Sequence, residues 1–97
     1  MIYHVVRHEQ WEAAKAEGIY KAGSLEKEGF IHASTGRQVR GVVERYYKGE
    51  SGLLILHIDE SRLTSPLKYE LSASVNEEFP HIYGPLNIDA VIKAAPL

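Results

Sequence analysis

Residues that could do chemistry are numerous in this sequence, which has five histidines and six tyrosines among 97 residues. His32 stands just before Ser34 and Thr35, where a predicted strand gives way to a helix that includes Gln38. Side chains at a strand end stay accessible, and the first N–H groups of a helix favour anions. Imidazole, two hydroxyls and an amide within one turn therefore indicate a site for a polar ligand. The structural alternative is that Ser34 or Thr35 caps the helix, since Thr35 and Gln38 have capping-box spacing.

A second candidate site lies in the segment 77–85, which reads Glu-Glu-Phe-Pro-His-Ile-Tyr-Gly-Pro. If this segment is extended, His81 and Tyr83 lie on the same side, because alternate residues of a strand share a face. Pro80 and Pro85 restrict the backbone on either side of the pair. Rigid aromatic side chains that form hydrogen bonds suit a flat ligand such as a base or a nicotinamide ring. The alternative is a proline-framed turn that buries the tyrosine.

Two further candidates lie within predicted strands. Glu70 faces away from Tyr69 and Leu71, so it is either solvated or lines a cleft if those two residues face the core. His4 follows Tyr3 in the first predicted strand and is a candidate ligand contact, with a buried structural histidine as the alternative.

The chemistry open to these residues is narrow. The absence of cysteine excludes disulfides, zinc–thiolate sites and thiol nucleophiles. A metal site made by His4, His32 and His81 stays open, although no histidine pair has the helical spacing of a zinc protease. Neither a glycine-rich phosphate loop nor a nucleophile elbow is present. Hydroxyl, imidazole and carboxylate chemistry remain, and no metal is expected.

Length and charge limit the classes of function. A chain of 97 residues is long enough for one domain, which we expect to span 1–97. The net charge of −2 argues against a broad basic face for duplex DNA. The longest aliphatic run covers only residues 53–56, and about 20 residues are needed to cross a bilayer. The start of the chain lacks a signal-peptide pattern. We therefore expect a cytoplasmic protein with no membrane or duplex DNA partner, and the oligomeric state is not indicated.

Hydrophobic periodicity predicts an α+β fold with two main helices and the order β-α-β-α-β-β-β. Strands are expected over 2–6, 29–34, 53–59, 67–72 and 88–94, with a helical turn over 61–63. The first helix should span 9–17 and end at Gly18. The second should open at Thr35 and place an apolar face, Val39, Val42, Val43 and Tyr46, against the core. Segment 19–25 is expected to be irregular or extended and 76–80 a loop. Trp11, Tyr46 and Tyr69 are expected in the core.

Blocks of this sequence resemble the bacterial family known as domain of unknown function 952. The resemblance covers essentially the whole chain and rests on Tyr3-His4, Trp11 with Ala14 and Gly18, Tyr20, Ser24-Leu25, the stretch 28–34 with Gln38, and the stretch 79–86. It implies a fold of the ADP-ribosyltransferase type, an α+β split sheet whose better-known members hold NAD or an ADP-ribose derivative in a cleft. A more distant likeness to RNA 2′-phosphotransferases, carried by Tyr3-His4, Gly18, His32-Ala33-Ser34 and the strand 53–59, implies a nucleotide-sized cleft between His4 and His32.

The sequence also departs from these relatives. The transferases continue from the first-strand histidine into Gly-Thr, whereas this chain has Val5-Val6, which would crowd a closely approaching ligand. The phosphotransferases hold phosphates with several arginines, and no arginine here matches those positions.

The resemblance implies an enzyme that acts on NAD or an ADP-ribose-like nucleotide, with NAD as a substrate and no certain bound cofactor. His32, His81 and Glu70 would be catalytic, and a second group would bind the ligand: His4, Ser34, Thr35, Gln38 and Tyr83. One alternative is a module of the same fold that binds a nucleotide without turning it over. A small interaction domain with no ligand is the other alternative.

Overall fold

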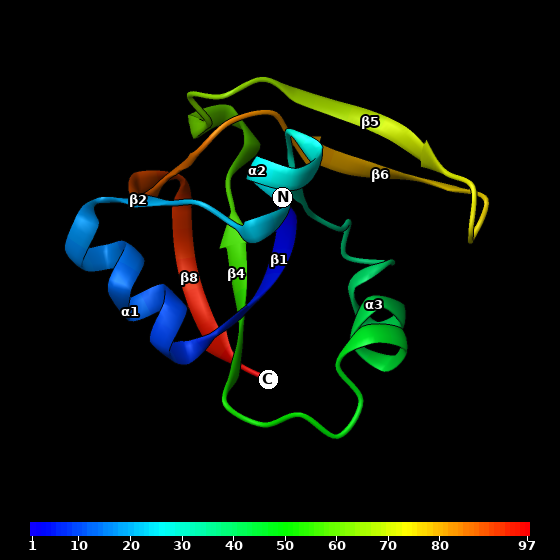
Figure 1. Ribbon diagram of the computed structural model, residues 1–97, viewed down its shortest axis with the longest axis horizontal. Helices are drawn as coiled ribbons and strands as arrows, with labels where there is room; N and C mark the ends of the chain where they lie inside the picture. The colour runs from blue at the N-terminus through cyan, green and yellow to red at the C-terminus, as the bar shows by residue number, and fades with distance from the viewer.

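The computed structural model describes residues 1–97 and has an α+β fold, as predicted. The chain forms three helices, eight strands and two short 3₁₀ turns, and all three helices precede β4 (Figure 1). The helices are α1 (His8–Glu17), α2 (Gly23–Glu28) and α3 (Val39–Tyr46), and the 3₁₀ turns are η1 (Glu60–Arg62) and η2 (Ile88–Ala90). The strands are β1 (Ile2–Arg7), β2 (Ile19–Tyr20), β3 (Ile31–His32), β4 (Leu53–Ile58), β5 (Leu67–Ser72), β6 (Glu77–Ile82), β7 (Leu86–Asn87) and β8 (Val91–Pro96).

The strands form three antiparallel sheets. One sheet has the order β1-β4-β8, the second pairs β2 with β7, and the third has the order β3-β6-β5. The two three-stranded sheets meet where Tyr3 and Ser34 exchange backbone hydrogen bonds of 2.8 Å. This junction places the end of β3 against β1, so that the segments carrying His4 and His32 lie side by side.

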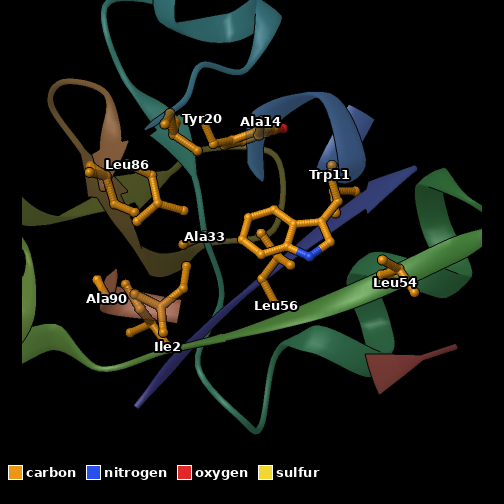
Figure 2. Close-up of a cluster of buried hydrophobic side chains, with 13 residues drawn as sticks. Ile2, Trp11, Ala14, Tyr20, Ala33, Leu54, Leu56, Leu86 and Ala90 are labelled. Atoms are coloured by element: carbon orange, nitrogen blue, oxygen red, sulfur yellow. The ribbon is translucent and has the colours of Figure 1, made fainter. Parts of the chain in front are cut away.

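The core lies between α1 and the first sheet. Trp11 and Ala14 are the buried residues of α1, and both pack with Leu56 of β4 in one hydrophobic cluster. Figure 2 shows the Trp11 indole near the middle of this cluster, with Tyr20 and Leu56 around it. The predicted role of Trp11 as a core residue is confirmed, because its exposed fraction is 5%.

Several predicted elements are confirmed within a residue or two. These are β1, α1, β4, β5 and the turn after β4. Gly18 ends α1 with φ at 86°, a left-handed conformation that glycine adopts without steric cost. Strand β4 is the central strand of its sheet, which agrees with its continuous run of apolar residues.

Three predicted element assignments are wrong. The segment 19–25 is not all extended, because α2 begins at Gly23; six residues are too few for a clear helical period. The chain therefore has three helices where two were predicted. The segment 76–80 is not all loop, because β6 begins at Glu77 and pairs with β5 through Pro80. The last strand begins at Val91 instead of residue 88, since Ile88–Ala90 forms a 3₁₀ turn.

The predicted start of the second helix is also wrong. Helix α3 begins at Val39, and neither the Thr35 nor the Ser34 side chain caps it. One of the two bonds of the predicted capping box is present, because Gln38 accepts a 3.0 Å hydrogen bond from the Thr35 N–H. Gln38 also donates a hydrogen bond of 2.7 Å to the Glu78 carbonyl. These bonds tie the turn before α3 to β6.

The apolar face of α3 does not enter the core. No residue of α3 is buried, and Tyr46 has 62% of its surface exposed. In Figure 1 the helix stands apart from the other helices, below the β5–β6 hairpin. Tyr69, on β5, is 46% exposed and is not a core residue either. An amphipathic period shows which face of a helix is apolar, but the neighbour that covers it is set by the rest of the fold.

Candidate functional site

A cavity of about 730 Å³ lies between α3, the far end of the β5–β6 hairpin, α2 and β1. The three histidines predicted as site residues all line this cavity: His4 from β1, His32 from β3 and His81 from β6. Ser34 lines it as well, and its wall is otherwise largely aromatic and apolar, with Tyr3, Tyr20, Phe30, Tyr46, Tyr47 and Phe79 among its residues. The volume lies within the range of ligand-binding cavities, about 300–1,000 Å³. We call this space the histidine cavity.

His4 is held by hydrogen bonds at both ring nitrogens. Its Nδ1 lies 2.5 Å from the His32 carbonyl oxygen, and its Nε2 lies 2.9 Å from the Tyr20 hydroxyl oxygen. A carbonyl can only accept, so Nδ1 carries the proton and Nε2 accepts from the tyrosine in the neutral ring. Burial of the ring lowers the pKa of His4 to about 4, and burial raises the pKa of Tyr20 to about 12. This pair therefore forms a neutral, rigid part of the cavity wall at pH 7.

His81 has one ring nitrogen engaged and one available. Its Nδ1 lies 2.7 Å from Glu70 Oε1, and no protein group bonds its Nε2. His81 is 8% exposed, and its ring stacks on Phe30 with centroids 4.0 Å apart and planes inclined by 18°. A proton on Nδ1, donated to the carboxylate, leaves the lone pair of neutral His81 on Nε2.

Glu70 is the common partner of His81 and Tyr83. The Tyr83 hydroxyl donates a short hydrogen bond to the same Oε1 atom that faces His81. The register explains the grouping: Glu70 pairs with Phe79, so the alternate residues Phe79, His81 and Tyr83 share its face. The hydrogen bonds from Tyr83 and then His81 lower the pKa of Glu70, and the carboxylate raises the pKa of Tyr83. Neither Glu70 nor Tyr83 lines the cavity, so both act on it through His81.

His32 lies beside His81 at the rim of the cavity. The two residues are register partners of β3 and β6, and their ring centroids are 5.4 Å apart. His32 Nε2 lies 2.9 Å from Glu28 Oε2, and Nδ1 has no protein partner. Two imidazoles, each beside a carboxylate, therefore lie at one end of the cavity.

The remaining predicted ligand contacts divide into two groups. Ser34 is buried at the cavity wall, with 5% of its surface exposed. Thr35 and Gln38 do not line the cavity, because the hydrogen bonds described above use them to join the turn before α3 to β6. The structure therefore brings the two predicted segments, 32–38 and 77–85, together. Thr35 and Gln38 join the two segments and do not line the cavity.

The alternative of a three-histidine metal site does not fit this geometry. No three His, Asp or Glu side chains gather in a way that could hold a metal ion. Both ring nitrogens of His4 already have partners, so that histidine has no lone pair to offer.

Sequence reasoning missed several residues of the site. Glu28 is the last residue of α2 and His32 lies in β3, so their contact depends on the turn at Gly29 and does not follow from helical spacing. Phe30 and Tyr20 were predicted only through the family resemblance. Neither the stacking of Phe30 on His81 nor the hydrogen bond between Tyr20 and His4 follows from sequence spacing. Arg45 lines the cavity from α3, and nothing in the helical period distinguished it from a solvated arginine.

The Glu70 cluster gives a direct test by NMR. Replacing Tyr83 with Phe removes the hydrogen bond that contributes most to the lowered pKa of Glu70, so that pKa should rise toward its ordinary value of 4.5. The measurement is the pH titration of the Glu70 carboxyl carbon. Tyr69→Phe is the matched control, because the Tyr69 hydroxyl bonds Glu60 and should leave Glu70 unchanged. Equal titration curves in the wild type and Tyr83→Phe would show that the tyrosine does not hold this carboxylate.

None of the helices has the length and apolar character needed to cross a membrane.

Comparison with known proteins adds a family and a fold. A family model described as "Protein of unknown function (DUF952)" matches residues 5–94. The crystal structure of protein CC0527 from Caulobacter crescentus is 33% identical, with a TM-score of 0.89 over 99% of this chain and 84% of that chain. The solution NMR structure of CC0527 has a TM-score of 0.85 at 33% identity, over 99% of this chain and 83% of that chain. No curated protein matches the chain significantly.

Proposed function

This chain belongs to the DUF952 family, and we propose from its own site that the histidine cavity binds and transforms a nucleotide-like ligand. The proposed substrate class is NAD or an ADP-ribose derivative. The observation that carries the proposal is His81, which is fixed by Glu70 through Nδ1 and has an unpartnered Nε2 beside a cavity of about 730 Å³.

The cavity wall supports binding of a flat, polar ring. Aromatic side chains supply surfaces for stacking, while Ser34 and the free nitrogens of His32 and His81 supply hydrogen-bonding groups. The fold supports the substrate class in a weaker way. Two antiparallel sheets meet through the backbone pairing of Tyr3 with Ser34, which supports a split sheet of the kind that the resemblance to ADP-ribosyltransferases implies. A shared fold alone does not establish an activity.

His81 is the proposed general base. In the hydrolysis of NAD, a water molecule attacks C1′ of the nicotinamide ribose, and the bond from C1′ to the nicotinamide nitrogen breaks. Nicotinamide leaves as a neutral base, and the proton of the attacking water passes to His81 Nε2. Glu70, although partly exposed, holds the ring in the tautomer that accepts this proton, the role that a carboxylate has beside the catalytic histidine of serine proteases. His32 and its partner Glu28 would assist as a second acid–base pair at the same end.

One observation favours binding without turnover as the second candidate. No Asp or Glu lines the cavity, so no carboxylate can contact the ribose or stabilise an oxocarbenium-like centre directly. Val5, which replaces the glycine expected from the resemblance, also lines the cavity and narrows it. A protein of this kind would bind the ligand without catalysing its conversion.

Turnover of NAD tests the first candidate. The wild type should release nicotinamide, measured by chromatography, and His81→Gln should reduce the rate at least about 100-fold, since a positioned general base contributes about 10²–10⁴. His8→Gln is the matched control, because His8 is exposed at the start of α1 and does not line the cavity. Calorimetric titration with NAD and ADP-ribose separates the candidates. Binding without nicotinamide release favours the binding module, and the absence of both would overturn both.

A further inference from the structure

The histidine cavity has an unusual balance of charge. Among the 20 residues that line it, Arg45 is the only Lys or Arg, and there is no Asp or Glu. The chain as a whole carries 13 acidic residues and a net charge of −2, and none of these acidic residues lines the cavity. The nearest carboxylates described above, Glu28 and Glu70, lie behind His32 and His81, so the α3 wall with Arg45 is the part of the cavity that favours an anion.

The Arg45 guanidinium has no acidic partner in the structure. Arg7, Lys15 and Arg62 form ion pairs with acidic side chains, whereas Arg45 is one of the cationic side chains that form none and is the one that lines the cavity. The guanidinium carbon lies 5.8 Å from the centroid of the Tyr46 ring. A planar guanidinium offers five N–H donors in a fixed arrangement that fits two oxygens of a phosphate.

The backbone of α3 makes room for this side chain. At Gly41, four residues before Arg45, an added Cβ would lie 3.1 Å from a terminal nitrogen of the guanidinium. The guanidinium therefore folds back along the helix over a position that has no side chain. Val42 and Tyr46 of the same helix line the cavity together with Arg45, so the Arg45 side chain belongs to the α3 wall of the cavity.

We propose that Arg45 is the phosphate-binding residue of the histidine cavity and that the ligand carries its phosphate at the α3 side. This rests on the proposed function for the identity of the ligand, and it narrows the class to phosphorylated nucleosides over nucleosides. The imidazoles of His32 and His81 then face the part of the ligand that lies away from the phosphate.

Matched ligand pairs test the proposal. Affinities are measured by calorimetry for adenosine and AMP, for nicotinamide riboside and its 5′-phosphate, and for inorganic pyrophosphate. The phosphorylated member of each pair should bind about tenfold more tightly at low ionic strength, since Arg45 is exposed and salt screens its charge. Arg45→Gln should abolish that difference. Arg40→Gln is the matched control, because Arg40 lies on the same helix, is exposed and does not line the cavity.

A second variant tests the position of the charge without removing it. Gly41→Ala places a methyl group 3.1 Å from a terminal nitrogen of the guanidinium, which must then shift by a few tenths of an ångström. The variant should weaken phosphate binding less than Arg45→Gln does and leave the binding of the nucleosides unchanged. Because alanine favours the helix more than glycine does, the thermal midpoint should not fall. This separates a loss of binding from a loss of folding.

The possible results distinguish this proposal from the proposed function. If nucleosides and nucleotides bind equally well, or if Arg45→Gln lowers both equally, the role of Arg45 is overturned while the cavity remains a ligand site. If pyrophosphate binds and shifts the Arg45 guanidinium signals in NMR spectra, but no nicotinamide is released, the role of Arg45 stands and the enzymatic proposal fails. Absence of any effect of pyrophosphate or nucleotides on Arg45 overturns the proposal.

Discussion

Acidification from pH 7 to pH 4 should lower the free energy of unfolding by about 3 kcal/mol through His4 alone. Burial lowers the pKa of His4 from 6.5 to about 4 in the folded protein. Above pH 6.5 both states are neutral at this residue and the contribution is constant. Between these two values the unfolded chain binds a proton that the folded chain excludes, so stability decreases as the pH falls. Below about pH 4 both states are protonated and the loss ends, and a shift of this size corresponds to about 3 kcal/mol.

Urea unfolding at a series of pH values measures this effect. His4→Asn and His4→Gln are compared with the wild type, because amides do not titrate and each amide can replace one of the two hydrogen bonds of the ring. Both variants should be less stable than the wild type at pH 7, and their stability should depend less on pH between 6.5 and 4. Glu70 contributes in the same direction at lower pH, since its lowered pKa adds stability that is lost as the pH falls through that value. Parallel curves for the variants and the wild type would show that His4 is not the source.

Replacing Trp11 with alanine should destabilise the protein by about 3–5 kcal/mol, the usual cost of removing a large buried aromatic side chain. Trp11 is 5% exposed and belongs to the cluster that joins α1 to β4 and β1. A domain of this size is stable by roughly 5–15 kcal/mol, so the variant would lose a large part of its stability.

Tyr46→Ala is the matched control for Trp11→Ala. The hydrophobic period of the sequence predicts a core position for Tyr46, whereas the structure leaves 62% of its surface exposed. Its replacement should therefore change the free energy of unfolding by no more than about 0.5 kcal/mol. Chemical denaturation followed by circular dichroism measures both values. A large loss in Tyr46→Ala would mean that α3 packs against the core in solution.

The histidine cavity couples function to stability at one point. His4 is part of the wall, and its two hydrogen bonds join β1 to β2 and to the end of β3. Variants of His4 will therefore affect folding and ligand binding together. Better choices for functional tests are His81, Glu70 and Arg45, because none of them belongs to the hydrophobic core cluster. Substitutions at these positions should therefore affect the core less than substitutions of His4 do.

Several parts of the molecule could be predicted from local sequence. Alternating and continuous apolar residues predicted β1, β4 and β5, and helix-forming residues followed by Gly18 predicted α1. The shared face of His81 and Tyr83 also followed from spacing, since strand periodicity is a property of the local backbone. The sequence therefore determined which residues could meet along one strand and which histidines end a strand.

Only the tertiary structure decided what those residues face. Glu70 meets His81 because β5 and β6 pair in one register, and a shift by one residue would turn the carboxylate to the other face. Helix α3 has the amphipathic pattern of a core helix, yet the turn tied to β6 holds it at the edge of the cavity. Arg45 reaches the histidine cavity for the same reason. Register and helix placement depend on contacts between segments far apart in the chain, and no local pattern of residues contains that information.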